Sequence, residues 1–178
     1  MSFTNSNESS IRKEKQWYAF YTRPRHEFVA AQQIGEAGIE YYLPTVVKTR
    51  QWSDRKKRVT LPLISGYIFI HADEKDRLLA LQISSIIHCI TFEGRPASIP
   101  EWQIDNLRRM LENQGDFFIT DDISAGTTVK IISGPFEGVI GKVTDSANGK
   151  VISVSIELLK RSVTAFLPKE SVVKHLDT

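Results

Sequence analysis

Residues 126–143 read GTTVKIISGPFEGVIGKV. Two runs rich in valine and isoleucine flank a Ser-Gly-Pro turn at 133–135; such residues favour strands, whereas glycine and proline mark tight turns. Phe136 is placed to tuck back under the sheet, and Gly138 or Gly141 allows a close backbone approach or a sharp bend. On spacing alone, a generic barrel hairpin explains the segment as well as a specific binding motif does.

The chain beyond this segment continues in short strand-like runs. No good helix is expected after residue 124, and Asn-Gly at 148–149 is a strong signal for a hairpin turn. Five short strands predict a small all-β, SH3-like barrel, because a closed barrel leaves no exposed strand edge. The predicted strands are 129–132, 139–143, 151–156, 162–167 and 172–173.

The first part of the chain has a different pattern, in which helices alternate with strands. The order β-α-β-β-α-β-α predicts an α+β domain, an antiparallel sheet flanked by helices. Asp73 is expected to cap the second helix and Pro100 to begin the third. The predicted strands cover 17–22, 39–47, 67–70 and 86–92, and the predicted helices 25–37, 74–82 and 100–112.

These patterns divide the chain into four segments. Residues 1–14 are expected to be a disordered polar tail, 15–113 the α+β domain, 114–122 a linker and 123–178 the barrel domain. Two adjacent phenylalanines at 117–118 are unusual in a linker, which suggests that they pack on one of the domains.

Several classes of function lack the residues that they require. The chain has one cysteine, Cys89, so it forms no internal disulfide and suits a reducing cytoplasm. No zinc-ligand spacing, phosphate-binding glycine loop or Gly-x-Ser-x-Gly elbow occurs. We therefore expect no enzyme, no cofactor and no metal. Without a signal peptide or an apolar run near about 20 residues, the protein is predicted to be cytoplasmic, with no membrane partner.

Positive charge is concentrated in the N-terminal part, although the net charge is only +2. Six basic residues and one acid, Asp54, lie between Lys48 and Arg58. This stretch is too polar for a core and is predicted to be a loop or a hairpin tip. Basic side chains beside Trp52 suit phosphates and unpaired bases, but a solvated hairpin with Trp52 packed on the domain fits equally well. A second cluster contains Arg23, Arg25 and His26.

Two linked motifs resemble the NusG-like transcription elongation factors. The N-terminal part is similar to the NusG N-terminal domain at 17–18, 22–27, 38–44, 62–70 and 97–100. The resemblance covers residues 16–175, with both domains in the family's order. Residues 126–143 are similar to the family's KOW motif, at Gly126, Lys130, Gly134, Pro135, Phe136, Gly138 and Gly141.

The closer likeness is to specialised members of this family. The run RQWSDRKK at 50–57 looks like the UpxY antiterminators of surface-polysaccharide operons, and RfaH is a more distant relative of the same kind. Ile-Ser at 64–65 replaces the usual Phe-Pro. Leu-Leu-Ala at 78–80 stands where RfaH meets the polymerase gate loop, so that contact is not carried over. The valine, isoleucine and threonine content of the barrel argues against RfaH-like refolding into helices.

The resemblance implies an apolar patch that grips the clamp coiled coil of the largest subunit of RNA polymerase. Phe69 and Leu107 could instead be core, because an apolar helix stripe usually is. The KOW barrel would recruit a ribosomal protein or Rho. The implied patch contains Tyr67, Phe69, Phe92, Ile104 and Leu107. The implied contacts to the non-template DNA strand are Arg23, Arg25, His26, Lys48, Arg50, Trp52 and Arg55.

Together these features predict an antitermination factor that suppresses pausing and termination at specific operons. A general NusG-type elongation factor linked to Rho has the same fold, and the run at 50–57 argues against it. A KOW-based ribosome- or RNA-binding protein predicts a basic barrel. From Ile119 to the end, however, basic and acidic residues are equal in number.

Overall fold

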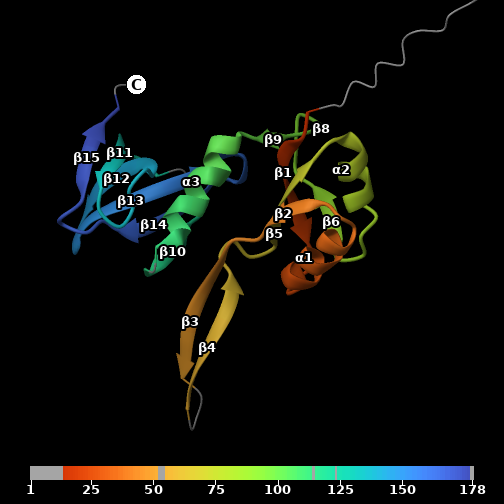
Figure 1. Cartoon of the computed structure of the whole chain (residues 1–178), viewed down its shortest axis with the longest axis horizontal. Coiled ribbons are helices and arrows are strands. Elements are labelled where there is room, and N and C mark those ends of the chain that lie inside the picture. The colour runs from red at the N-terminus through yellow and green to blue at the C-terminus, as the bar shows by residue number, and fades with distance from the viewer. Residues whose placement is uncertain (1–13, 52–54, 114, 123, 177–178) are drawn as a thin grey trace, which may run out of the picture.

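The computed structural model describes residues 14–51, 55–113, 115–122 and 124–176. Two larger antiparallel sheets lie on either side of helix α3 (Glu101–Glu112), and a two-stranded hairpin projects away from both (Figure 1). Trp52 and residues 1–13 of the predicted tail lie outside the described residues.

The N-terminal sheet has the strand order β2-β5-β1-β6, with β9 paired to β1. Side chains alternate between the two faces of a sheet. Phe20 and Ile68 therefore pack with α1 and α2, whereas Trp17 and Phe69 share a buried cluster with α3. The elements are β1 (Gln16–Thr22), α1 (Glu27–Glu36), β2 (Glu40–Tyr42), β5 (Tyr67–Ala72), α2 (Glu74–Ala80), β6 (Ile86–Cys89), β7 (Thr91–Phe92), β8 (Arg95–Pro96) and β9 (Ser98–Ile99).

Most predicted N-terminal elements are confirmed, with shifted ends. Asp73 caps α2, because its carboxylate accepts the Asp76 N–H at 2.8 Å. Pro100 precedes α3 as its N-cap instead of forming the first helical residue. The predicted strand 86–92 is interrupted at Ile90, so that it forms β6 and β7.

The basic stretch, predicted to be a loop or a hairpin tip, lies in a hairpin. Strands β3 (Thr45–Gln51) and β4 (Lys56–Pro62) pair in antiparallel register throughout. Threonine and valine at 45–47 and 59–60 favour strands. Charged side chains are tolerated there because most residues of the two strands are exposed or half-buried.

The C-terminal sheet has the strand order β10-β14-β13-β12-β11-β15. The five predicted strands are present, while closure into a barrel stays a prediction. A sixth strand, β10, lies within the predicted linker and pairs with β14, because Phe117 and Ile119 pack against the core on alternate positions. The domain boundaries themselves stay a prediction. The elements are β10 (Phe117–Thr120), β11 (Thr127–Ser133), β12 (Ile140–Ser146), β13 (Gly149–Ile156), the 3-10 turn η1 (Glu157–Leu159), β14 (Arg161–Phe166) and β15 (Val172–His175).

Gly66 fixes the turn into β5, and its replacement tests the packing of the N-terminal sheet. Its φ is +82°, its N–H donates to the buried Glu27 carboxylate at 2.8 Å, and a Cβ there would lie 2.8 Å from Tyr21 Cε2. We expect Gly66→Ala to lower the free energy of unfolding by about 1–3 kcal/mol, measured by urea denaturation, because backbone strain and ring displacement add.

Gly94→Ala is the matched control for this substitution. Its φ is +77°, but nothing lies within 4 Å of a Cβ at that position. It should therefore report the backbone strain alone and lower stability less than Gly66→Ala. Equal losses in the two variants would contradict the role assigned to the contact with Tyr21.

Candidate functional site

The five residues of the implied apolar patch differ in exposure. Phe92 is 66% exposed, and Tyr67 is half-buried. Phe69, Ile104 and Leu107 are fully buried in a cluster that contains residues of both larger sheets. The structure thus brings these three together as core and leaves Tyr67 and Phe92 accessible.

Helix α3 presents two buried amide side chains to the C-terminal sheet. Asn106 donates from Nδ2 to the Ile140 carbonyl, and its Oδ1 accepts the Ile140 N–H at 2.7 Å. Gln103 Oε1 accepts the Glu157 N–H at 3.2 Å. Gln103 is 1% and Asn106 is 5% exposed. A buried polar group without a partner costs about 1–3 kcal/mol, so these bonds specify where the sheet docks.

Ile140 lies where the pairing of β12 with β13 has ended. The first described pair of that ladder is Lys142 with Ser153, two residues further along β12. Asn106 takes the place of a strand partner, because its amide carries a donor and an acceptor as a peptide group does. No separate sequence signal marks this role, and Gln103 and Asn106, which adjoin Ile104 and Leu107, are not among the predicted site residues.

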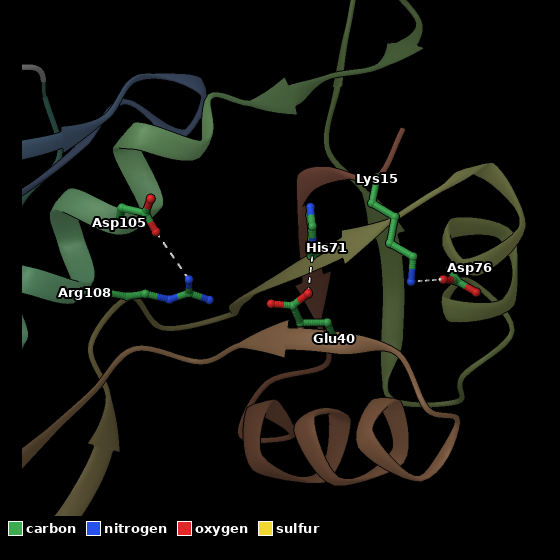
Figure 2. A network of polar contacts seen from close by, with 6 residues as sticks. All are labelled: Lys15, Glu40, His71, Asp76, Asp105 and Arg108. Atoms are coloured by element: carbon green, nitrogen blue, oxygen red, sulfur yellow. Dashed lines mark hydrogen bonds and ion pairs between the residues drawn. The ribbon is translucent and has the colours of Figure 1, made fainter. Parts of the chain in front are cut away.

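Arg108 fastens α3 to the N-terminal sheet. Its guanidinium lies 4.8 Å from the Trp17 ring centroid and 4.9 Å from that of Tyr42, so two rings share one cation. Asp105 pairs with Arg108 at 3.4 Å (Figure 2). Burial raises the pKa of Tyr42 to about 12, so its phenol stays protonated beyond the pH at which an exposed tyrosine ionises. One helix is therefore held to both sheets by different side chains.

Further polar contacts order the N-terminal sheet around this point. Trp17 stacks on His71 with 4.9 Å between ring centroids, and His71 Nδ1 lies 2.8 Å from the Glu40 carboxylate (Figure 2). Lys15 pairs with Asp76 of α2 at 2.9 Å. The surface that receives α3 is thus tied to β2, β5 and α2.

The predicted nucleic-acid-binding residues that the structure describes are all exposed. Lys48 and Arg50 project from the same face of β3, because they are two residues apart in a strand. Arg50 lies directly opposite Lys57, and like charges in such a pair destabilise a hairpin. A bound polyanion would relieve this repulsion. The described and exposed members are Arg23, Arg25, His26, Lys48, Arg50 and Arg55.

Part of this basic set is gathered in one groove. Arg25, Lys48 and Arg50 line it together with Tyr21 and Phe28. The other described members of the set do not line the groove.

The motif at 126–143 shapes the C-terminal sheet and its docking. Phe136 is 4% exposed within the core. A Cβ at Gly141 would lie 2.7 Å from the Ser153 carbonyl oxygen, so glycine allows β12 to approach β13. The Gly138 carbonyl accepts a bond from Arg109 Nη1 of α3 at 3.3 Å.

A comparison of the sequence with protein families decides the assignment. The profile of the family described as "Transcription termination factor nusG" matches residues 15–108, more than half of the chain. The chain belongs to the NusG family. Members of the NusG family are transcription factors that work with RNA polymerase and are not enzymes. No curated protein matches the sequence closely enough to count as a relative.

Three solved structures resemble this NusG-family chain. "Domain interaction in Thermotoga maritima NusG" is 19% identical and covers 86% of this chain and 94% of its own, with a TM-score of 0.46. Conformations A and B of the "MjSpt4:Spt5 complex" are 17% and 19% identical. Both matches cover 90% of this chain. The match to conformation A covers 97% of that chain with a TM-score of 0.32, and the match to conformation B covers 99% of that chain with a TM-score of 0.31. Because these scores lie below 0.5, membership of the NusG family rests on the sequence profile.

Two other kinds of site were sought in the described part of the chain. No helix there combines the length and apolar character needed to cross a membrane. The same residues contain no group of three or more histidine, cysteine, aspartate or glutamate side chains that could hold a metal ion.

Replacing Asn106 tests whether its amide specifies docking. Asn106→Ala leaves the Ile140 N–H and carbonyl without their partner in the docked state, which should weaken docking by about 1–3 kcal/mol, or roughly five- to 150-fold. Small-angle X-ray scattering should then show a larger radius of gyration. Trp102→Ala, at a 55% exposed position of α3, is the control. An unchanged radius for Asn106→Ala would contradict the role of the amide.

Proposed function

We propose that this NusG-family chain is a cytoplasmic antitermination factor. It binds RNA polymerase and the non-template DNA strand at particular operons, including surface-polysaccharide operons. The observation that carries the proposal is the exposed basic hairpin, on which Arg50 lies opposite Lys57. Phosphate groups neutralise such a pair, and the single-stranded part of a transcription bubble offers phosphates together with unpaired bases.

The polymerase contact is the apolar patch, and the docked C-terminal sheet covers part of it. Tyr67 and Phe92 are accessible in the docked chain. Ile104 and Leu107 become available when the C-terminal sheet leaves α3, and Phe69, stacked near Tyr42 at 6.3 Å, supports the patch from beneath. A helical coiled-coil tip is bound by a few apolar and aromatic anchors of this kind.

The proposed action on transcription is mechanical. A factor that bridges the polymerase clamp across the cleft disfavours clamp opening, provided that it binds the closed state better than the open state. Pausing and release then become less frequent. The chain needs no catalytic group for this action.

The released C-terminal sheet is proposed to recruit a further protein, a ribosomal protein or Rho. Leu158 and Leu159 of η1 are half-buried against the cluster that contains α3. Undocking exposes these apolar side chains and offers them to a partner. Recruitment of this partner and binding to RNA polymerase therefore both depend on undocking of the C-terminal sheet.

Binding to a reconstituted elongation complex tests the polymerase contact. We expect Tyr67→Ala to lose about 2 kcal/mol of binding, roughly thirtyfold, because anchor residues dominate such interfaces. Trp102→Ala should bind as wild type. Asn106→Ala should bind more tightly than wild type, because docking of the C-terminal sheet then competes less with polymerase binding.

A double variant, Lys48→Ala with Arg50→Ala, separates the DNA contact from the polymerase contact. It should lose mainly the part of the affinity that depends on salt and on the bubble sequence. If neither this variant nor Tyr67→Ala weakens binding, the proposed function is wrong. Equal effects on termination at all operons would instead favour a general elongation factor.

A further inference from the structure

A groove of about 790 Å³ lies between two parts of the chain that are far apart in sequence. One wall comes from the start of α1 and the hairpin β3–β4, and the other comes from β10. Its volume lies within the range of ligand-binding pockets. The residues that bear on its chemistry are Arg25, Phe28, Lys48, Arg50, Phe117 and Phe118.

The first wall is positively charged. Arg25, Lys48 and Arg50 line it, and all three are exposed. Among the lining residues, Glu27 alone carries a carboxylate. Glu27 is 6% exposed, and its carboxylate accepts the Gly66 N–H at 2.8 Å inside the protein. The groove therefore presents cations to a ligand and suits an anionic chain.

The second wall supplies aromatic surface. Phe118 is 43% exposed and Phe117 is half-buried, while Phe28 on the facing side is 46% exposed. Aromatic rings beside a row of cations bind single-stranded nucleic acid, because every base offers a face for stacking and every phosphate a charge. The bases of a duplex are already stacked and paired, so they cannot use such a wall.

We infer that β10 and the basic hairpin form one groove for an unpaired nucleic-acid strand, complete only while the C-terminal sheet is docked. The inference rests on the proposed nucleic-acid role of the hairpin and adds the residues of β10 to it. Strand β10 pairs with β14 from Phe117–Ala165 to Thr120–Ser162. Phe118 also packs near Phe166, with 6.0 Å between ring centroids. When the C-terminal sheet undocks from α3, β10 and its aromatic side chains therefore move away from the basic hairpin with it.

This arrangement couples strand binding to docking. A strand that contacts both walls binds the docked state better than the undocked state, and so shifts the population toward the docked state. A substitution that lowers the fraction of docked chains therefore weakens strand binding, because only docked chains offer both walls. A free single strand and the polymerase clamp thus favour opposite states of the chain.

Fluorescence anisotropy with the full chain tests the groove. The probes are labelled single strands of about ten nucleotides, one DNA and one RNA of the same sequence. Phe118→Ala should weaken binding by about five- to 150-fold, because it removes one stacking ring. Asn106→Ala, which acts only on docking, should weaken binding as well. The double variant should weaken binding of the single strand no more than the more damaging of the two single substitutions does.

Control variants keep these outcomes separable. Phe118→Leu retains an apolar side chain without the ring and should bind weakly while unfolding at the wild-type temperature, and Trp102→Ala should bind as wild type. If Lys48→Ala with Arg50→Ala weakens binding but Phe118→Ala and Asn106→Ala do not, the second wall is refuted and the proposed function stands. If none of the variants weakens binding of either strand, the nucleic-acid role itself fails.

Discussion

The hydrogen bonds between the Asn106 amide and the backbone of Ile140 are the contact on which the other features depend. They join α3 to the C-terminal sheet at Ile140, which pairs with Lys130 of β11 but lies beyond the pairing of β12 with β13. The same docking places β10 beside the basic hairpin, and Ile104 and Leu107 lie in the buried cluster that residues of both sheets share. The contact between α3 and the C-terminal sheet therefore determines both which part of the proposed polymerase patch is buried and whether the groove beside the basic hairpin forms.

The chain consequently has two opposing uses for one docking event. In the docked state, the proposed polymerase patch is reduced to Tyr67 and Phe92, and the proposed groove for a nucleic-acid strand is complete. In the undocked state, the rest of the patch is free but the hairpin has lost its aromatic wall. Because one equilibrium governs both, a ligand of either state acts on the other by population shift alone.

The sequence predicted the order of the elements and much of their extent, because strand-forming residues and turn signals are local. The sequence left a loop and a hairpin tip open for the basic stretch at 48–58, because its charges resemble those of a solvated segment. The pairing of β3 with β4 favours the hairpin. Strand β10 was missed because its partner, β14, is about forty residues away in sequence. The apolar stripe that contains Ile104 and Leu107 is equally typical of a buried core and of an exposed binding patch. The sequence cannot distinguish the two, because the answer depends on where the C-terminal sheet lies. Gln103 and Asn106 were missed for the same reason.

Amide hydrogen exchange at Ile140 and Glu157 tests the docked arrangement most directly, because both N–H groups donate to side chains of α3. The account predicts slow exchange at both sites in the wild-type chain. It predicts much faster exchange at Ile140 in Asn106→Ala, while the Leu167 N–H, bonded to the Lys150 carbonyl at 2.8 Å within the C-terminal sheet, stays protected. Fast exchange at Ile140 and Glu157 in the wild-type chain, beside a protected Leu167, would contradict it.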